Sequence, residues 1–199
     1  MSSIVMAIAF FVWIYFLGNI NPAIIIGRAQ GIDVRAQGSG NPGTTQAMRS
    51  LGKKAGVVVF LIDAFKGWLG FSIPLFILGT YGFAFMCGLC VVVGHMYPAV
   101  FGFRGGKGVA TAFGVLLAAS WPHALILLAI VIVVTAICRY VSLSVLIAVA
   151  AALVMEFVFF VFDPIWLTII LALIVWKHRA NIGRLVRGEE NKLSFGGKK

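Results

Sequence analysis

Charged residues are scarce in this chain of 199 residues, and acidic residues are scarcer still. Aspartate and glutamate together number 6 and charged residues make up 11% of the sequence, whereas 61% of the residues are hydrophobic. A soluble domain of this size needs far more polar residues to cover its surface. The composition therefore predicts an all-α polytopic membrane protein that folds as a single domain over residues 1–199.

Residues that hold metals or cofactors are also few. Three cysteines make no disulfide framework, and the C-x-x-C pair of Cys87 and Cys90 lies inside an apolar run with no second pair. We interpret these cysteines as helix-packing residues. The three histidines are scattered, with no carboxylate cluster beside them. We expect no metal, no cofactor and no obligate protein partner.

Apolar runs recur along the whole chain, and a helix needs about 20 apolar residues to cross a bilayer. The first run has neither a basic segment before it nor a small-residue cleavage site, so it predicts a spanning helix and not a signal peptide. The pattern predicts seven transmembrane helices, of which the fourth, fifth and seventh are short: 3–26, 55–79, 82–102, 108–120, 124–138, 142–161 and 165–177.

Basic residues fix the orientation of these spans. Fifteen of the sixteen lysines and arginines follow the first, third, fifth or seventh span, in the segments 27–54, 102–108, 139–142 and 177–199. The positive-inside rule then places the N-terminus outside and the C-terminus in the cytoplasm. The formal charge of +10 is spread over short segments between apolar runs. It therefore indicates contact with membrane lipid, not nucleic acid.

The sixteenth basic residue, Lys66, lies inside the second span, three residues after Asp63. That spacing puts both side chains on one helix face, which favours a structural ion pair over a catalytic role. Glu156 in the sixth span has no such local partner, and its role is unassigned.

The stretch GSGNPGTTQAMR (38–49) has the letters of a dinucleotide fingerprint but lacks the strand and βαβ unit that such a site requires. Its glycines let several backbone N–H groups point at one anion, and Arg49 supplies positive charge. A helix that opens near Thr44 would direct its N-terminus at the same anion. Anion binding is favoured over a flexible loop with an ordinary cap.

The second polar stretch, GHMYPAVFGFRGGKGVAT (94–111), resembles a P-loop without being one, because Gly108 stands where Ser or Thr is required. Glycines at 105, 106 and 108 allow close backbone approach, while Arg104 and Lys107 add charge. His95 alone is more typical of a packing histidine than of a catalyst. Two weaker stretches, CRYVSLS (138–144) and WKHRANIGRLVRGEENK (176–192), contribute Ser142, His178 and Asn181.

Three blocks, GSGNPGTTQAMRSLGKKAG, GHMYPAVFGFRGGKGVAT and HRANIGRL, together resemble the bacterial acyl-phosphate-dependent glycerol-3-phosphate acyltransferases, the PlsY family. The resemblance spans nearly the whole chain. It implies a seven-helix enzyme of the bacterial inner membrane whose active site faces the cytoplasm. Such an enzyme transfers a fatty acyl group from acyl phosphate to the 1-hydroxyl of glycerol 3-phosphate. The products are lysophosphatidic acid and phosphate, the first step of phospholipid biosynthesis.

The resemblance also implies roles for residues of this chain. The glycine loop and Ser142 would hold the acyl-phosphate head, and the basic and amide side chains would hold glycerol 3-phosphate. The expected catalytic residues are Ser39, Arg49, Lys107, His178 and Asn181. The expected substrate-binding residues are Gly40, Asn41, Gly43, Thr44, Thr45, Arg104, Gly105, Gly106 and Ser142. The sequence shows no side-chain base, and the family's proposed answer is that the donor's own phosphate accepts the hydroxyl proton.

Four positions depart from the family pattern: Thr44 and Gln46 in the glycine loop, Arg104 where Lys is usual, and Ala180 where Glu is usual. The first span also reads LGNINPA where the family tends to have GSIPFG. None of these changes removes an expected anion ligand. The alternative from another class is a transporter of phosphate or a phosphorylated metabolite, which would use the same basic cavity. A seven-helix photoreceptor is disfavoured, because the last span has no lysine for a Schiff base.

Overall fold

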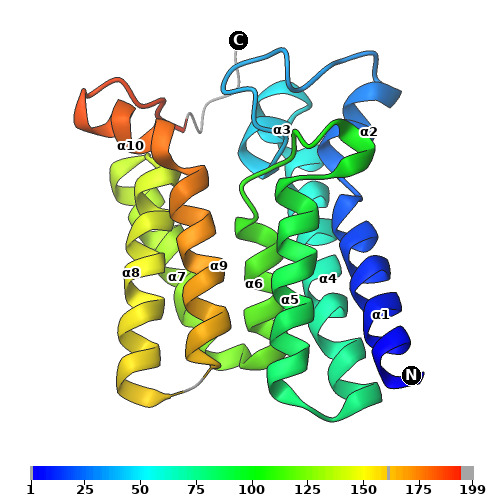
Figure 1. Cartoon of the computed structure of the whole chain (residues 1–199). Coiled ribbons are helices and arrows are strands. Elements are labelled where there is room, and N and C mark those ends of the chain that lie inside the picture. The colour runs from blue at the N-terminus through cyan, green and yellow to red at the C-terminus, as the bar shows by residue number, and fades with distance from the viewer. Residues whose placement is uncertain (1, 161, 194–199) are drawn as a thin grey trace. The chain divides into compact units, whose positions relative to one another are not determined.

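The computed structural model describes residues 2–160 and 162–193, and these residues form helices, turns and loops without a strand (Figure 1). The predicted all-α class is thereby confirmed. The chain forms two compact units, Met1–Ala119 and Ser120–Lys199. The predicted orientation rests in part on Lys198 and Lys199, which lie outside the described residues. Position 161, at the end of the sixth predicted span, lies outside them as well.

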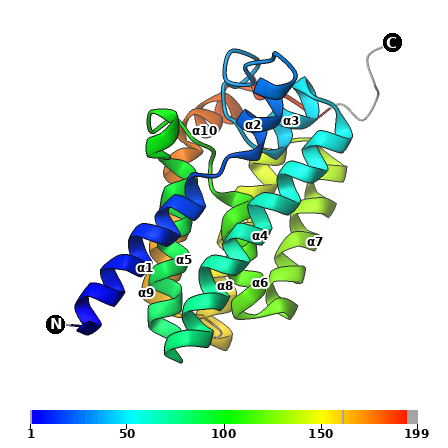
Figure 2. The same ribbon diagram turned by 90° about the vertical axis from the view of Figure 1, so that its right-hand side faces the viewer.

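The unit Met1–Ala119 is built around the long helix α4. This helix packs against α1, α5 and α6, and α1 also packs along α5 (Figure 2). The loops and short helices between α1 and α4, and those between α5 and α6, lie at the same end of this unit (Figure 1). Its elements are α1 (Ser2–Asn19), α2 (Pro22–Ala29), α3 (Thr44–Ser50), α4 (Lys53–Leu78), α5 (Tyr81–Met96), the 3₁₀ turn η1 (Ala99–Phe101) and α6 (Val109–Ala119).

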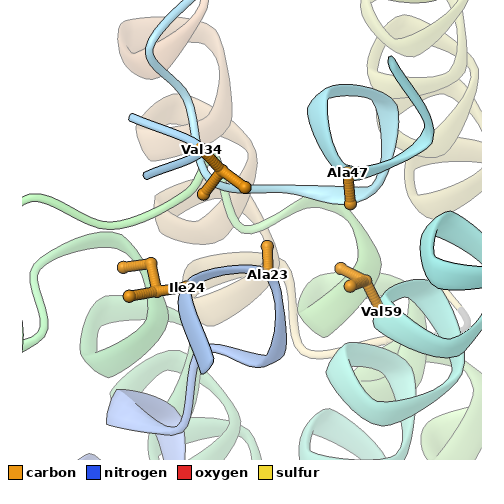
Figure 3. Packing of buried hydrophobic residues seen from close by; sticks show 5 residues of the cluster. All are labelled: Ala23, Ile24, Val34, Ala47 and Val59. Carbon is orange, nitrogen blue, oxygen red and sulfur yellow. The ribbon is translucent and has the colours of Figure 1, made fainter. Parts of the chain in front are cut away.

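A small apolar core fastens the first polar loop to the helices beneath it. Ala23 and Ile24 of α2, Val34 of the following loop, Ala47 of α3 and Val59 of α4 are buried together (Figure 3). Full burial of a valine or isoleucine side chain stabilises a fold by about 1.5–3 kcal/mol. The loop is therefore anchored on both sides of its glycine-rich stretch.

The unit Ser120–Lys199 contains α7 (Trp121–Cys138), α8 (Val141–Phe159), α9 (Pro164–Lys177) and α10 (Arg179–Val186), with α8 packed against the other three. Helix α9 begins where the Asp163 carboxylate accepts hydrogen bonds from the backbone N–H groups of Ile165 and Trp166, with Pro164 at its first position. Both features are favourable at a helix start.

Each predicted span corresponds to a helix, and the protein has several spans. Among the described residues, four helices are long and apolar enough to cross a membrane, or six if each bent pair counts as one span. Helix α6 has 11 residues and is about 16 Å long, shorter than a bilayer core of about 30 Å. The first predicted span, 3–26, is not continuous, since α1 and α2 meet at 43° around Asn21 and Pro22.

Candidate active site

The glycine loop, residues 38–43, turns as its composition predicts. Gly38 and Gly40 have φ angles of +54° and +67°, the left-handed region in which glycine has no steric cost. The Gly40 N–H donates to the Gln37 carbonyl at 3.0 Å, and the Gly43 N–H donates to the Asn41 carbonyl at 2.9 Å. The loop therefore has a defined shape, with Ser39 exposed on it.

Gln46, one of the departures from the family pattern, supports this loop from below. Its side chain is buried, and Oε1 lies 3.4 Å from both the backbone nitrogen and the hydroxyl of Ser39. Its Nε2 donates to the Ser50 hydroxyl at 2.8 Å. Because these bonds link the loop to α3, Gln46 orients Ser39, a role that the sequence did not reveal.

Helix α3 begins at Thr44, as predicted, and has Gly43 as its N-cap without a side-chain cap. It is only seven residues long, so its dipole is small, and Arg49 lies in its last turn. Arg49 is exposed, while Asn41, Thr44 and Thr45 are partly buried.

Two asparagines in the break between α1 and α2 hold the polar segments in place. Asn21 donates through Nδ2 to the Pro42 carbonyl at 3.2 Å, and its Oδ1 caps α2 by accepting from the Ile24 N–H at 3.1 Å. Asn19 accepts through Oδ1 from the Val100 N–H at 3.2 Å. Sequence reasoning missed both residues, although amides beside a proline inside an apolar run were the available signal.

The lysine loop, residues 104–108, packs onto the end of α5. The Gly106 N–H donates to the His95 carbonyl at 3.1 Å. A Cβ at Gly105 would overlap that carbonyl oxygen, and a Cβ at Gly106 would overlap Nε2 of the His95 ring. These glycines thus have a packing reason besides the expected approach to phosphate. Arg104 is exposed and Lys107 is partly buried.

In the unit Ser120–Lys199, Glu190 draws two expected site residues together. Its carboxylate accepts from the Ser142 hydroxyl at 2.8 Å, from Nδ2 of Asn181 at 2.5 Å and from Nε of Arg184 at 2.7 Å. Burial by itself raises the pKa of Glu190, but these hydrogen bonds outweigh burial and hold the pKa below its ordinary value of 4.5. Glu190 was missed, and its sequence signal was only a pair of acids in a basic tail.

His178 lies at the 55° bend between α9 and α10 and is buried. Its Nδ1 lies 2.8 Å from the Ile174 carbonyl, which can only accept, so Nδ1 carries the hydrogen. In the neutral ring, Nε2 then holds the lone pair. His178 is the N-cap of α10, and Asn181 lies three residues later in the first turn of that helix, as their spacing predicts.

The structure thus places the expected residues in two sets. In Met1–Ala119, the glycine loop and the turn that precedes the lysine loop are hydrogen-bonded to the same helix break. In Ser120–Lys199, Ser142 and Asn181 share one carboxylate. No group of three potential metal ligands lies close enough to hold an ion within 2–160 and 162–193.

Known proteins resemble this chain over almost its whole length. A family model described as glycerol-3-phosphate acyltransferase matches residues 8–188. A glycerol-3-phosphate acyltransferase of Clostridioides difficile is 42% identical over 90% of this chain and 91% of its own.

Two crystal structures of PlsY, an integral membrane glycerol 3-phosphate acyltransferase, are also similar, and each alignment covers 95% of this chain and 96% of the other. The glycerol 3-phosphate form has a TM-score of 0.90 and 39% identity. The lysophosphatidic acid form has a TM-score of 0.87 and 38% identity. The protein is a multi-pass membrane protein, and its chain belongs to the glycerol-3-phosphate acyltransferase family.

Proposed function

We propose that this protein transfers a fatty acyl group from acyl phosphate to the 1-hydroxyl of sn-glycerol 3-phosphate, giving lysophosphatidic acid and phosphate. The observation that carries the proposal is the close structural likeness, over nearly the whole chain, to a PlsY in its glycerol 3-phosphate form. Both substrates carry a phosphate and one has a long apolar tail. Apolar helices that end in glycine-rich, basic loops suit such a pair of substrates.

The reaction needs little activation of its nucleophile. An acyl phosphate is a mixed anhydride, so the bond from the glycerol oxygen to the acyl carbon forms as the bond from that carbon to phosphate breaks. The leaving phosphate takes the hydroxyl proton, and no side-chain base is required. The protein then contributes positioning and stabilisation of the developing charge.

We assign the acyl-phosphate head to the glycine loop, where left-handed glycines shape an exposed turn and Gln46 orients Ser39. Arg49, Lys107, His178 and Asn181 bind glycerol 3-phosphate, and Arg104 adds charge. Ser142 donates its one hydroxyl hydrogen to Glu190. In that rotamer the Ser142 hydroxyl has no hydrogen left to donate to a substrate oxygen. Ser142 therefore contributes by holding Glu190, which also accepts from Asn181.

We further propose seven spans with the N-terminus outside and the C-terminus in the cytoplasm, and one functional domain formed by both units. The location of the polar loops of Met1–Ala119 at one end of that unit supports this topology, because most of its basic residues lie in them (Figure 1). The site then lies on the cytoplasmic side of a bacterial inner membrane, with lipid around the helices.

The transporter alternative has no support among the relatives, which are acyltransferases. The special loops of Met1–Ala119 also lie at one end of that unit, whereas transporter sites commonly lie near the membrane midplane.

The test is phosphate release by purified protein in the presence of acyl phosphate and glycerol 3-phosphate, with product analysis for lysophosphatidic acid. Arg49→Ala should lower kcat/KM by about 100-fold or more, the usual cost of losing one charge-stabilising donor. Arg187→Ala is the control, because Arg187 pairs with Glu189 on the surface and both side chains are well exposed. A folded wild-type protein that binds glycerol 3-phosphate without turnover contradicts the proposal.

A further inference from the structure

Three titratable side chains that the proposed chemistry does not use are buried together in Met1–Ala119. Asp63 and Lys66 of α4 and His95 of α5 are 1%, 2% and 3% exposed. Oδ1 of Asp63 lies 2.7 Å from Nζ of Lys66, at ion-pair distance though without hydrogen-bond geometry, and 3.2 Å from Nδ1 of His95. The predicted ion pair is confirmed, and His95 makes it a triad.

Lys66 donates to the backbone at the point where the first span breaks. Its Nζ lies 3.1 Å from the Gly18 carbonyl oxygen and 2.5 Å from that of Ile20. A continuing helix would satisfy these two carbonyls with the N–H groups of residues 22 and 24. Residue 22 is a proline without an N–H, and the N–H of Ile24 donates to Asn21 instead. Lys66 supplies the donors that the break removes, and its ammonium carries three.

The same ammonium fixes the histidine on which the lysine loop rests. Nζ of Lys66 lies 2.9 Å from Nδ1 of His95. The opposite side of that ring abuts the Cα of Gly106, and the His95 carbonyl accepts the Gly106 N–H. A change in the ring position would therefore move the backbone at Gly106, the residue before Lys107.

The break itself holds the two polar segments through its asparagines. Asn19, between the two carbonyls bound by Lys66, accepts from Val100 of η1. Asn21, next to Ile20, donates to Pro42 of the glycine loop. Both loops expected to bind substrate phosphate are thus joined through short hydrogen-bonded paths to one buried ammonium.

We propose that Lys66, with Asp63 and His95, is a positioning residue of the acyl-transfer reaction, holding the glycine loop and the lysine loop in register with each other. This inference rests on the proposed function. A buried ion pair that served stability alone would be replaceable by apolar residues at little cost. The Lys66 ammonium differs because it also satisfies backbone groups of an irregular segment, which an apolar side chain leaves without donors.

The experiment compares Lys66→Met with the double variant Asp63→Asn/Lys66→Met. Methionine has nearly the length of lysine but no donors, and the second substitution removes the charge that the first would leave buried alone, a large penalty in itself. Steady-state kinetics for glycerol 3-phosphate and for acyl phosphate are measured beside thermal unfolding, on the full-length protein in lipid. The double variant should fold, raise the KM for glycerol 3-phosphate by about tenfold and lower kcat/KM by about 100-fold, the scale expected for misplacement of about 1 Å.

The matched control is the buried hydroxyl pair of Thr135 and Ser144, 2.6 Å apart, in the other unit. Thr135→Val/Ser144→Ala should shift the unfolding temperature without changing either KM. If the variant Asp63→Asn/Lys66→Met folds and keeps the wild-type KM and kcat, the positioning role is overturned. The ion pair would then have a structural role alone. Absence of turnover in the wild type instead overturns the proposed function, so the two failures are distinct.

Discussion

The two units of this protein hold their site residues by different physical means. In Met1–Ala119, the polar loops are tied to a helix break by buried asparagines and a buried lysine, and one of these, Asn21, is 1% exposed. In Ser120–Lys199, Ser142 and Asn181 are held by one carboxylate on a segment that follows the last helix. The first arrangement is part of the packing between helices, whereas the second depends on Glu190 in the segment after α10.

This difference has consequences for how each set of contacts is lost. The asparagine bonds of Met1–Ala119 involve no charge, so acid and salt leave them unchanged, and they are lost only when packing is disturbed. The Glu190 contacts include an ion pair with Arg184, which is weakened by protonation and by salt. Disruption of packing should therefore damage the asparagine contacts most, whereas acid and salt should affect the Glu190 contacts.

Among the substitutions that compare the two units, Gly105→Ala should have the largest effect. The added Cβ would overlap the His95 carbonyl oxygen and lie 2.5 Å from Cδ of Pro98, and neither is a flexible side-chain end. The lysine loop must shift, and we expect kcat/KM to fall by about 100-fold.

Gly183→Ala in α10 is the matched control for this substitution, since its nearest neighbour beyond the helix is Nη1 of Arg187 at 3.4 Å. It should keep activity within about twofold and gain about 0.5–1 kcal/mol of stability. Near wild-type activity of Gly105→Ala would show that the lysine loop is not fixed by its contact with α5.

An intermediate effect is expected at Asn21, where two substitutions separate the helix cap from the loop contact. Asn21→Ser keeps an oxygen that can cap α2 but is too short to reach the Pro42 carbonyl. We expect about a tenfold fall in kcat/KM, because an unsatisfied buried carbonyl costs about 1–3 kcal/mol.

Asn21→Ala should lose both the contact with Pro42 and the cap of α2. Its free energy of unfolding should therefore be about 1 kcal/mol lower than that of Asn21→Ser. Kinetics and thermal unfolding on both variants separate the two roles. Equal kinetics for wild type and Asn21→Ser would show that the hydrogen bond from Asn21 to Pro42 does not position the glycine loop.

The smallest effect is expected from Glu190→Gln. Glutamine keeps an oxygen for Ser142 and Asn181 but loses the attraction to Arg184, worth about 1 kcal/mol or about fivefold in KM for glycerol 3-phosphate. Glu189→Gln is the control, because its pair with Arg187 is well exposed and should contribute nothing measurable.

Acid titration sharpens the same prediction. The pKa of Glu190 is lower in the folded protein than its ordinary value of 4.5, so its contribution to stability is present above that value and is lost as the pH falls through the folded pKa. The Leu193 N–H, which donates to the Arg139 carbonyl at 2.7 Å, reports on this tail. Its hydrogen-exchange protection, corrected for intrinsic rate, should drop below about pH 4.5 in the wild type and show no such drop in Glu190→Gln.

Several structural features were readable from the sequence because their signals are local. The glycines at 38 and 40, the start of α3 at Thr44 and the spacing of Asp63 and Lys66 depend on residues within one or two turns, and the structure agrees with each. The bend of the first span around Asn21 and Pro22 was missed, since the prediction rested on the apolar composition of 3–26 as a whole and not on the amides beside its proline.

The sequence by itself determined that this protein is helical and membrane-spanning, because long apolar runs satisfy their own backbone groups in lipid by forming helices. It also determined the family, through three polar blocks whose order and spacing resemble those of its members. Only the tertiary structure decided which side chains hold those blocks. Lys66 lies 48 positions from Gly18, and Glu190 lies 48 from Ser142. No local periodicity relates such pairs, because their contact depends on where packed helices bring unsatisfied backbone and buried charge together.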